Sequence, residues 1–453
     1  MKDTAIKYPP VIKALIAIVI FELSGVISIY LPGVFFTIFR LIGVSIFIFV
    51  LFKYKFVRMK GSIYPLFVVF MIWTLFILFR GSMLGNPPLG RNSLYDILYY
   101  NITYDYSALG YFMPLIALFS FNSESLFYGK KIGILLALLS LLLVILNWQE
   151  LFVGSEAKGQ SQLVNADGEE LAIRMASNYL FLAKWLVLFL LFNYGYKNSK
   201  LEIILPVYFV LSFLTQVLGG GRGASFLGLM YILIFIFILF KYPTYCYDKT
   251  NNRIRSSSRY FAILGLFMLA YGIYYLINNT TIFDFLFSRA FVEGTIGQIN
   301  ADAAREVLRS DFVNDFNADP LSWLFGRGVN GTFQCSISDL SIMGRRSAME
   351  WGYLYYILKG GVPYLAMYVF LILHAAYLGL RKSKNTLCKA AAFICILSIV
   401  QLVTVSHPGM TMHFFMTWFC FGLLENDTVR NFDDMTVNRM FNYKVLNIGK
   451  KVL

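Results

Sequence analysis

The residues of this chain best suited to chemistry are arginines, and one polar stretch concentrates them. Residues 279–350 contain Arg289, Arg305, Arg309 and Arg327. The planar guanidinium grips a phosphate through two hydrogen bonds and keeps its charge. Arg305 and Arg309 are spaced i, i+4, so on a helix they share a face and together can hold a doubly charged group such as a pyrophosphate. The alternative is surface pairing with neighbouring carboxylates, which we favour for Arg309 but not for Arg305.

A second candidate anion site is the segment GGGRGAS, from Gly219 to Ser225. Glycines let the backbone approach a ligand closely, and the apolar run that follows begins a helix whose first amides point outward. Arg222 supplies the positive charge. The alternative is a tight turn in which Arg222 extends to the lipid head groups. The segment alone favours neither interpretation.

Two residues are candidates for a general base. Glu350 begins a Tyr- and Trp-rich segment near a predicted membrane surface, where apolar surroundings raise the pKa of a carboxyl and suit it to take a proton from a substrate hydroxyl. The alternative is an acid favoured by the helix dipole. His407, in SHPGMTMHF, is the second candidate, although a lone histidine is more often structural. No Cys-x-x-Cys pair or other metal-ligand spacing occurs, so we predict no metal and no cofactor.

Composition indicates that these residues sit in a membrane protein. Of 453 residues, 58% are hydrophobic and only 14% are charged, against roughly 25% charged in soluble domains. The net charge of +14 fits the positive-inside rule better than nucleic-acid binding, so no nucleic acid is expected as a partner. We predict an all-α polytopic integral membrane protein with about twelve spans, each of about 20 residues. The predicted spans are 12–31, 34–52, 62–79, 106–121, 132–149, 176–194, 202–219, 225–241, 260–278, 361–380, 390–406 and 411–425.

The distribution of basic residues predicts the orientation. With the N-terminus in the cytoplasm, 25 of the 39 Lys and Arg residues fall on the inside, as the positive-inside rule requires. Both termini are then cytoplasmic. The predicted organisation is nine spans in 1–278, a large extracytoplasmic loop in 279–360 with the catalytic and substrate-binding helices, three spans in 361–425, and a polar cytoplasmic tail in 426–453 that is regulatory or disordered.

The loop itself has a predictable order of elements. Ala301 to Phe316 has the pattern of an amphipathic helix. Asp319 to Gly331 is rich in turn residues. Ser347 to Gly361 reads as a helix broken by its closing glycines just before Pro363.

Four features together resemble the O-antigen polymerase and ligase superfamily, the Wzy-type polysaccharide polymerases. They are the many-span topology with one dominant outer loop, the GGGRGAS segment, Arg305 followed by DPLSWLFGRGVNG, and MEWGYLYYILKGGVPYL. The match covers roughly residues 200–380. Where many relatives have His in the last motif, this chain has Glu350.

The resemblance implies a GT-C-like fold and an inverting, metal-independent glycosyl transfer at the outer face of the bacterial inner membrane. Its substrates are undecaprenyl-pyrophosphate-linked oligosaccharides, and a chain-length regulator in the membrane is a possible partner. Arg222 and Arg305 would neutralise the departing pyrophosphate, with Arg289, Arg309 and Arg327 as further substrate-binding residues. Glu350, or else His407, would accept the hydroxyl proton.

Two other functions stay open on sequence grounds. An O-antigen ligase that uses lipid A core as acceptor shares all of these motifs, although the histidine of its loop is missing here. A flippase or transporter for lipid-linked oligosaccharides also suits twelve spans. Transporters usually have short loops and inverted repeats, so the long polar insert and the lack of a repeat argue against that class.

Overall fold

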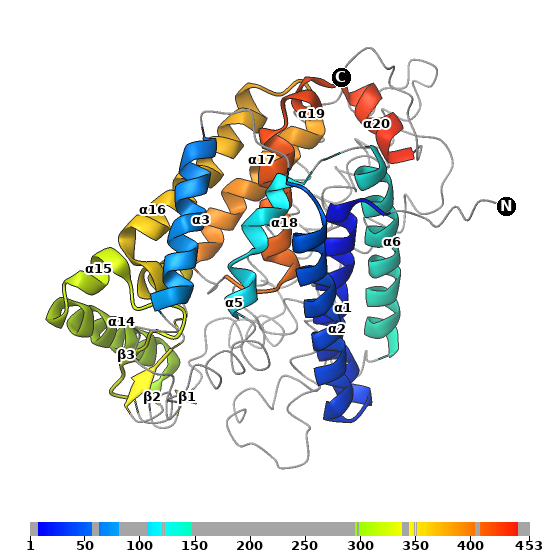
Figure 1. Cartoon of the computed structure of the whole chain (residues 1–453). Helices are drawn as coiled ribbons and strands as arrows, with labels where there is room; N and C mark the ends of the chain where they lie inside the picture. Colours follow the sequence, from blue (N-terminus) through cyan, green and yellow to red (C-terminus); the bar gives the residue numbers. More distant parts are fainter. Residues whose placement is uncertain are drawn as a thin grey trace, which may run out of the picture.

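The computed structural model describes residues 8–56, 63–80, 107–119, 121, 123–146, 295–296, 299–337, 344–347, 349, 351–403 and 408–442. These parts are mostly helical, as predicted (Figure 1). The only strands among them form two short antiparallel pairs. Thr295–Ile296 (β1) pairs with Ile299–Asn300 (β2), and Phe333–Gln334 (β3) pairs with Arg345–Arg346 (β4). The predicted spans 176–194, 202–219, 225–241 and 260–278 lie outside the described residues.

The first three predicted spans are helices. Pro10–Tyr30 (α1) and Gly33–Lys53 (α2) form a hairpin, and Tyr64–Phe79 (α3) follows. Proline stands in the first turn of α1 and of α3, where its missing N–H has no helical partner to lose. A Cβ on Gly43 would lie 2.8 Å from the carbonyl oxygen of Ala17. This glycine therefore lets α1 and α2 approach closely.

The fourth predicted span, 106–121, is wrong as one continuous helix. The chain forms a single turn, Ser107–Gly110 (α5), and then a separate 3-10 helix, Met113–Leu118. Pro114 has no N–H for the carbonyl of Gly110, so an α-helix cannot continue through this point. Gly110 also lies against the backbone of Gly409, 2.5 Å from where its Cβ would be. The next helix, Ser123–Leu146 (α6), begins nine residues earlier than the predicted 132–149.

The three C-terminal predicted spans correspond to the helices Gly352–Arg381 (α16), Thr386–Val400 (α17) and Met412–Glu425 (α18). A short 3-10 helix, Gln401–Val403, extends α17. Among the described residues, three helical segments are long and apolar enough to cross a membrane, namely Gly33–Lys53, Gly352–Arg381 and Thr386–Val403. These helices make the chain a candidate membrane protein. The full count of twelve spans and the side on which the loop lies stay predictions.

Two short helices follow α18 where the sequence suggested a regulatory or disordered tail. They are Asp427–Asn431 (α19) and Asp434–Asn442 (α20). The Asp434 carboxylate accepts hydrogen bonds from the amide and the hydroxyl of Thr386, at 2.7 and 2.9 Å. The Asn385 side chain donates to the carbonyl of Val429 at 2.7 Å. Residues 427–442 are therefore folded onto the start of α17, so the alternative of a disordered tail is wrong for these residues, and a regulatory role stays a prediction.

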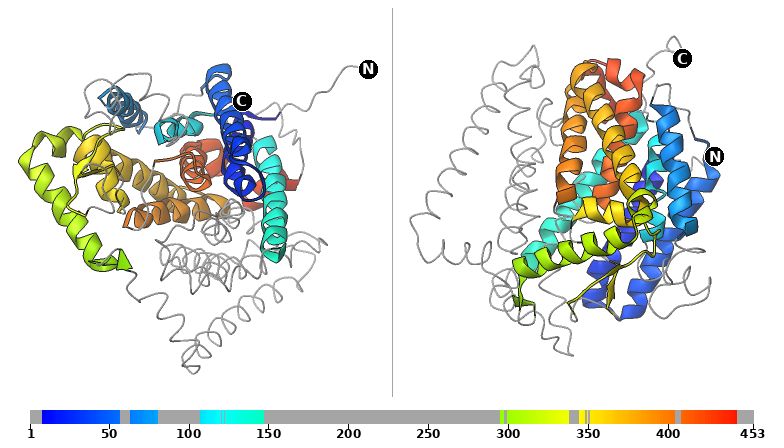
Figure 2. Two further views of the ribbon diagram at one scale, coloured as in Figure 1. Left: turned by 90° about the horizontal axis from the view of Figure 1, so that it is seen from below. Right: turned by 90° about the vertical axis from the view of Figure 1, so that its left-hand side faces the viewer.

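The polar loop forms a module at the other end of the helices. The predicted helix Ala301 to Phe316 is confirmed as Ala301–Ala318 (α14), and Leu321–Phe325 (α15) follows it. Figure 1 shows α14 and α15 at the end of the bundle opposite α19 and α20. In the right-hand view of Figure 2, α14 runs crosswise over the lower end of the helices.

The bundle and the module each have an apolar core. Trp418 lies at the centre of the larger one and contacts the rings of Phe67, Phe70, Tyr368 and Phe421. The module's core joins Phe312 and Phe316 of α14 to Phe333 of β3 and to Leu354 and Leu358, early in α16. The first turns of α16 thus belong to the module and the rest of α16 to the bundle.

Candidate functional site: an arginine network on a broken helix

The site is built on a break in α16. Gly361 has φ 78° and ψ 176°, which no helix accommodates, and Pro363 has no N–H for the carbonyl of Lys359. The freed carbonyls are used to bind other segments. Leu358 O accepts from the Arg327 amide at 2.7 Å, and Lys359 O accepts from the Gly328 amide at 2.9 Å. Gly360 O accepts from the indole of Trp73 at 2.8 Å. The break in the helix is the docking point of the loop.

Two glycines make this docking possible. Gly326 ends α15 with φ 64°, and a Cβ there would lie 2.4 Å from the carbonyl of Lys359. A Cβ on Gly361 would lie 2.2 Å from the carbonyl oxygen of Leu324. Both positions need a left-handed backbone and leave no room for a side chain. Residues 326–331 (GRGVNG) therefore pack with their backbone directly against residues 359–361 (KGG) of α16.

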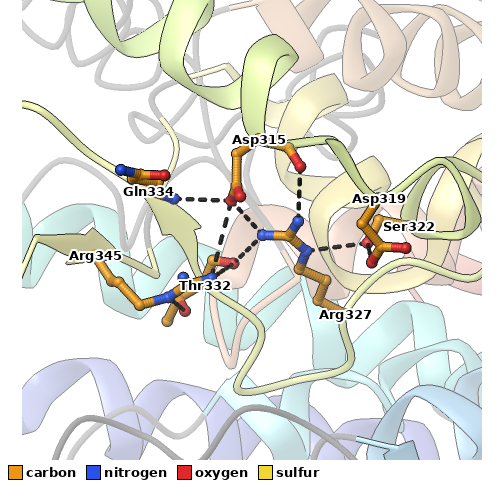
Figure 3. A network of polar contacts seen from close by, with 7 residues as sticks. All are labelled: Asp315, Asp319, Ser322, Arg327, Thr332, Gln334 and Arg345. Atoms are coloured by element: carbon orange, nitrogen blue, oxygen red, sulfur yellow. Dashed lines mark hydrogen bonds and ion pairs between the residues drawn. The ribbon is translucent and has the colours of Figure 1, made fainter. Parts of the chain in front are cut away.

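Arg327 is the centre of the polar network on this docking point (Figure 3). Its guanidinium donates to the Asp315 carboxylate, to the Asp315 carbonyl at 3.1 Å, and to the Thr332 carbonyl at 2.8 Å. Its Nε donates to Ser322 Oγ at 3.0 Å. The guanidinium carbon also lies 4.6 Å from the ring centroid of Phe316. Arg327 is buried and satisfied by the protein itself.

Asp315 is the carboxylate that this network shares. It accepts from Arg327 and from the amide of Gln334 at 2.9 Å, and it lies 3.9 Å from Arg345 Nη2. Burial alone raises the pKa of this carboxyl. The hydrogen bonds from Arg327 and Gln334, with the charges of Arg327 and Arg345, outweigh burial and hold the pKa below its ordinary value. Asp315 therefore stays ionised.

Arg345 gives the network its more exposed positive charge. It stands in β4, opposite Gln334 of β3. Its Nε donates to the Thr332 hydroxyl at 2.8 Å, and its Nη2 donates to the Thr332 carbonyl at 3.2 Å. Its side chain is 35% exposed, against 7% for Arg327. The network contains two guanidiniums and two carboxylates, because Asp319 joins it through Ser322, so its formal charges balance. Its more exposed guanidinium, that of Arg345, suits an anionic ligand.

Lys359 fixes the turn from the α16 side. Its ammonium group is buried and donates to the carbonyls of Gly331 and Ser347, at 2.9 and 3.1 Å. It also lies 5.0 Å from the ring centroid of Tyr355. Burying a lysine costs free energy unless its charge is hydrogen-bonded. These two hydrogen bonds therefore connect Lys359 to the turn at Gly331 and to Ser347, just after β4.

The predicted site residues fall into three groups. Arg327 braces the fold, whereas the sequence suggested substrate binding. Arg309 is exposed and paired with Glu306 at 2.8 Å, the alternative favoured for it, while Arg305 lies half-buried on the same helix. The others lie outside the described residues, namely Arg222, Arg289, Glu350 and His407.

Sequence reasoning missed Asp315 and Arg345 as parts of the site. Arg345 is thirteen residues from Thr332, and Asp315 is twelve from Arg327. The sequence signal for this part of the site is Gly344, which directly precedes Arg345 and Arg346. Gly344 has φ 72° in the turn that brings Arg345 beside β3. In comparisons with known proteins, no family model, curated protein or solved structure matched the chain.

Proposed function

We propose that this protein is a membrane-bound polysaccharide polymerase that transfers an undecaprenyl-pyrophosphate-linked chain onto a lipid-linked repeat unit at the outer face of the bacterial inner membrane. The observation that carries the proposal is the pair Arg327 and Arg345, held by one carboxylate at the break in α16. The partly exposed guanidinium of Arg345, fixed by Thr332 and Asp315, suits an anionic ligand. A lipid-linked pyrophosphate is such an anion.

The proposed reaction is an inverting displacement. The acceptor hydroxyl oxygen forms a bond to the anomeric carbon of the donor chain, and the bond from that carbon to the pyrophosphate oxygen breaks. The leaving oxygen keeps the electron pair, and undecaprenyl pyrophosphate departs. Arg222 and Arg305, joined by Arg345, neutralise the charge that develops there. Glu350, or else His407, takes the hydroxyl proton. Arg327 holds Arg345 in place through Asp315 and does not itself meet the substrate.

The arginine assignment is tested with three charge-conserving variants, Arg222→Lys, Arg305→Lys and Arg345→Lys. Lysine keeps the charge but loses the bidentate fork. We expect chain growth on purified lipid-linked repeat units to fall about a hundredfold in each. Arg439→Lys is the matched control, because Arg439 is exposed on α20 at the opposite end of the molecule. Normal chain growth in all three variants, at equal protein level, removes the pyrophosphate-binding mechanism.

Three further experiments examine the reaction class. Polymerisation should persist in EDTA. If EDTA abolishes it and magnesium restores it, the arginines are not what neutralises the leaving pyrophosphate.

Glu350→Gln should lose about a hundredfold in rate if Glu350 is the base. If Glu350→Gln is active and His407→Ala is not, the base is His407. The surface polysaccharide of a deletion strain separates the alternatives: single repeat units on lipid A core indicate a lost polymerase, and free lipid-linked polymer indicates a lost ligase.

A further inference from the structure

We propose that α15 is an interfacial anchor, whose apolar side chains lie in the lipid bilayer beside α3 and hold the loop module at the membrane surface. The partner is the bilayer itself. This inference concerns the position of the module and stands or falls independently of the reaction proposed above.

The first observation is the distribution of side chains on α15. Leu321 is 65% exposed and Leu324 is 44% exposed, and Phe325 is exposed as well. The polar residue of this helix is turned the other way. Ser322 is fully buried, where it donates to the Asp319 carboxylate at 2.6 Å and accepts from Arg327. A five-residue helix that buries its serine and exposes its leucines has its apolar side outward.

The second observation is that this surface continues onto a bundle helix. Phe325 stacks on Trp73 of α3, with ring centroids 6.0 Å apart, and meets Phe76 edge-on at 6.1 Å. The outward side chains of α3 next to this contact are apolar: Ile72 is 61% exposed and Leu75 is 52% exposed. Figure 1 shows α15 at the lower end of α3 and α16. The exposed apolar residues of α15 and α3 thus form one surface.

The third observation is the depth at which α15 docks. From Val362 to Arg381 the second part of α16 has 20 residues, and at about 1.5 Å per residue it spans about 30 Å, the thickness of a bilayer core. One edge of the core then falls at Arg381 and the other at the break beside Gly361. The carbonyl of Leu324 meets Gly361 at this break. Val362, the next residue, is exposed and apolar.

A lipid partner explains these features better than a second copy of the chain. The surface is continuous with the outward face of α3, a shorter apolar helix, and Leu324 contacts Gly361 of α16, a helix long and apolar enough to cross the membrane. Apolar side chains at that depth are already surrounded by lipid, and every exposed methylene buried there contributes about 0.8 kcal/mol. Association with another copy would need a complementary surface at the same depth.

The test measures the surroundings of α15 directly. Leu321→Cys and Leu324→Cys are labelled with a small fluorophore, and the protein is placed in nanodiscs that hold one copy each. The background carries Cys246→Ala, because the other four cysteines are buried. Quenching by nitroxide lipids is compared with quenching by iodide in water. Glu306→Cys on α14 is the matched control, since Glu306 is an exposed, charged residue of the same module.

We expect lipid quenching to exceed iodide quenching at 321 and 324, and the reverse at 306. Labels at 321 and 324 that are quenched by iodide as strongly as at 306 overturn the proposal. Labels shielded from both quenchers also overturn it, because a protein surface then covers α15. Each variant must keep the thermal unfolding midpoint of the unlabelled protein, so that a misfolded module is not read as a lipid contact.

Discussion

At the scale of single residues, the site depends on one carboxylate. The Asp315 carboxylate accepts hydrogen bonds from Arg327 and from the amide of Gln334, and it forms a longer ion pair with Arg345. Removing one member of a buried charge pair usually costs more than the pair contributes, because the other charge stays buried and unpaired. Arg327 has no route to solvent at 7% exposure. Asp315 is therefore the residue whose loss should disturb the module most.

We expect Asp315→Asn to destabilise the module by about 3 kcal/mol, since the neutral amide leaves the Arg327 guanidinium unpaired. Thermal unfolding followed by tryptophan fluorescence is the measurement, because Trp323 belongs to the module's aromatic core. Glu306→Gln is the control. Its exposed pair with Arg309 should change the stability by no more than about 0.5 kcal/mol. Equal stability of the two variants would contradict the central role of Asp315.

The same carboxylate predicts a pH dependence. Its pKa is lower in the folded protein than the ordinary value of 3.8. A depressed pKa contributes stability that is present above the ordinary value and is lost as the pH falls through the folded value. The stability gap between wild type and Asp315→Asn should be constant from pH 7 to about pH 5 and should shrink below about pH 4. Unfolding midpoints across this range measure it, and a gap that widens in acid would refute the assignment.

Sequence reasoning found half of this residue-scale picture. Arg327 was predicted as a substrate-binding residue from the resemblance, and its bracing role was not foreseen. The choice between the two depends on Asp315 and Thr332, which the turn at Gly326 and the β3–β4 pair bring to it. Contacts of this kind have no fixed spacing along the chain. The bracing role was therefore visible only in the folded structure.

At the scale of elements, the break in α16 was predictable but its use was not. Gly360, Gly361 and Pro363 interrupt any helix, and the sequence indicates the interruption within one residue. The segments that bind the freed carbonyls are far away in the chain, at Trp73 and at Arg327 and Gly328. A local pattern shows that a helix ends. It does not show what the ended helix binds.

Gly361→Ala should undock the loop module from α16. Alanine disfavours the left-handed backbone at φ 78°, and its methyl group would overlap the carbonyl oxygen of Leu324. We expect a loss of about 3 kcal/mol or more in module stability, at the level of other steric and backbone defects. Faster amide exchange in residues 326–334 is the measurement. Gly33→Ala is the control, because no atom lies within 4 Å of its added Cβ.

The last two helices of the described chain correct the expectation for the C-terminal tail. Their sequence is polar, which suggested disorder, but three contacts hold them on the bundle. The Asn385 side chain donates to the Val429 carbonyl of α19, Asp434 binds the start of α17, and α20 lies against α6. A polar sequence therefore does not by itself predict disorder, because here the polar side chains bind the start of α17. The same limitation applies to 106–121, where an apolar stretch hid the interruption at Pro114.

Asp434→Ala should loosen this terminal pair of helices. It removes both hydrogen bonds to Thr386, and a lost helix-end partner costs about 1 to 2 kcal/mol. Amide exchange of α20 should then quicken about tenfold, because about 1.4 kcal/mol is a factor of ten. Met435→Ala is the matched control, since Met435 is exposed on the same helix. Unchanged exchange in Asp434→Ala would mean that α20 is held by α6 alone.

At the scale of the whole molecule, the alternation of the helices supports the predicted orientation. α16 runs from the module to the end where α19 and α20 lie, and α17 returns (Figure 1). The basic residues Arg381, Lys382 and Lys384 stand at that end. The loop module stands at the other. The positive-inside rule then predicts that the module is external.

Reporter fusions test this orientation. A reporter joined after Asn330, in the module, should give an external signal, and one joined after Lys384 should give a cytoplasmic signal. A fusion after Arg255 should also be cytoplasmic on the predicted topology, although this residue lies outside the described part of the chain. Fusions after Asn330 and Lys384 that report the same side would contradict the membrane arrangement, and reversed signals would invert it.

The hydrogen bond between Trp73 and Gly360 joins residues that are 287 positions apart in the chain. Ribosomes add about 5 to 20 residues per second, so α3 leaves the ribosome about 15 to 60 s before its partner is made. The turn at Gly328 is made only in the last part of that interval, and the break at Gly361 only at its end. The helix that receives the loop is therefore made long before the residues that bind it. Assembly of this end of the molecule is a late event, and the speed of translation sets the earliest moment at which it can occur.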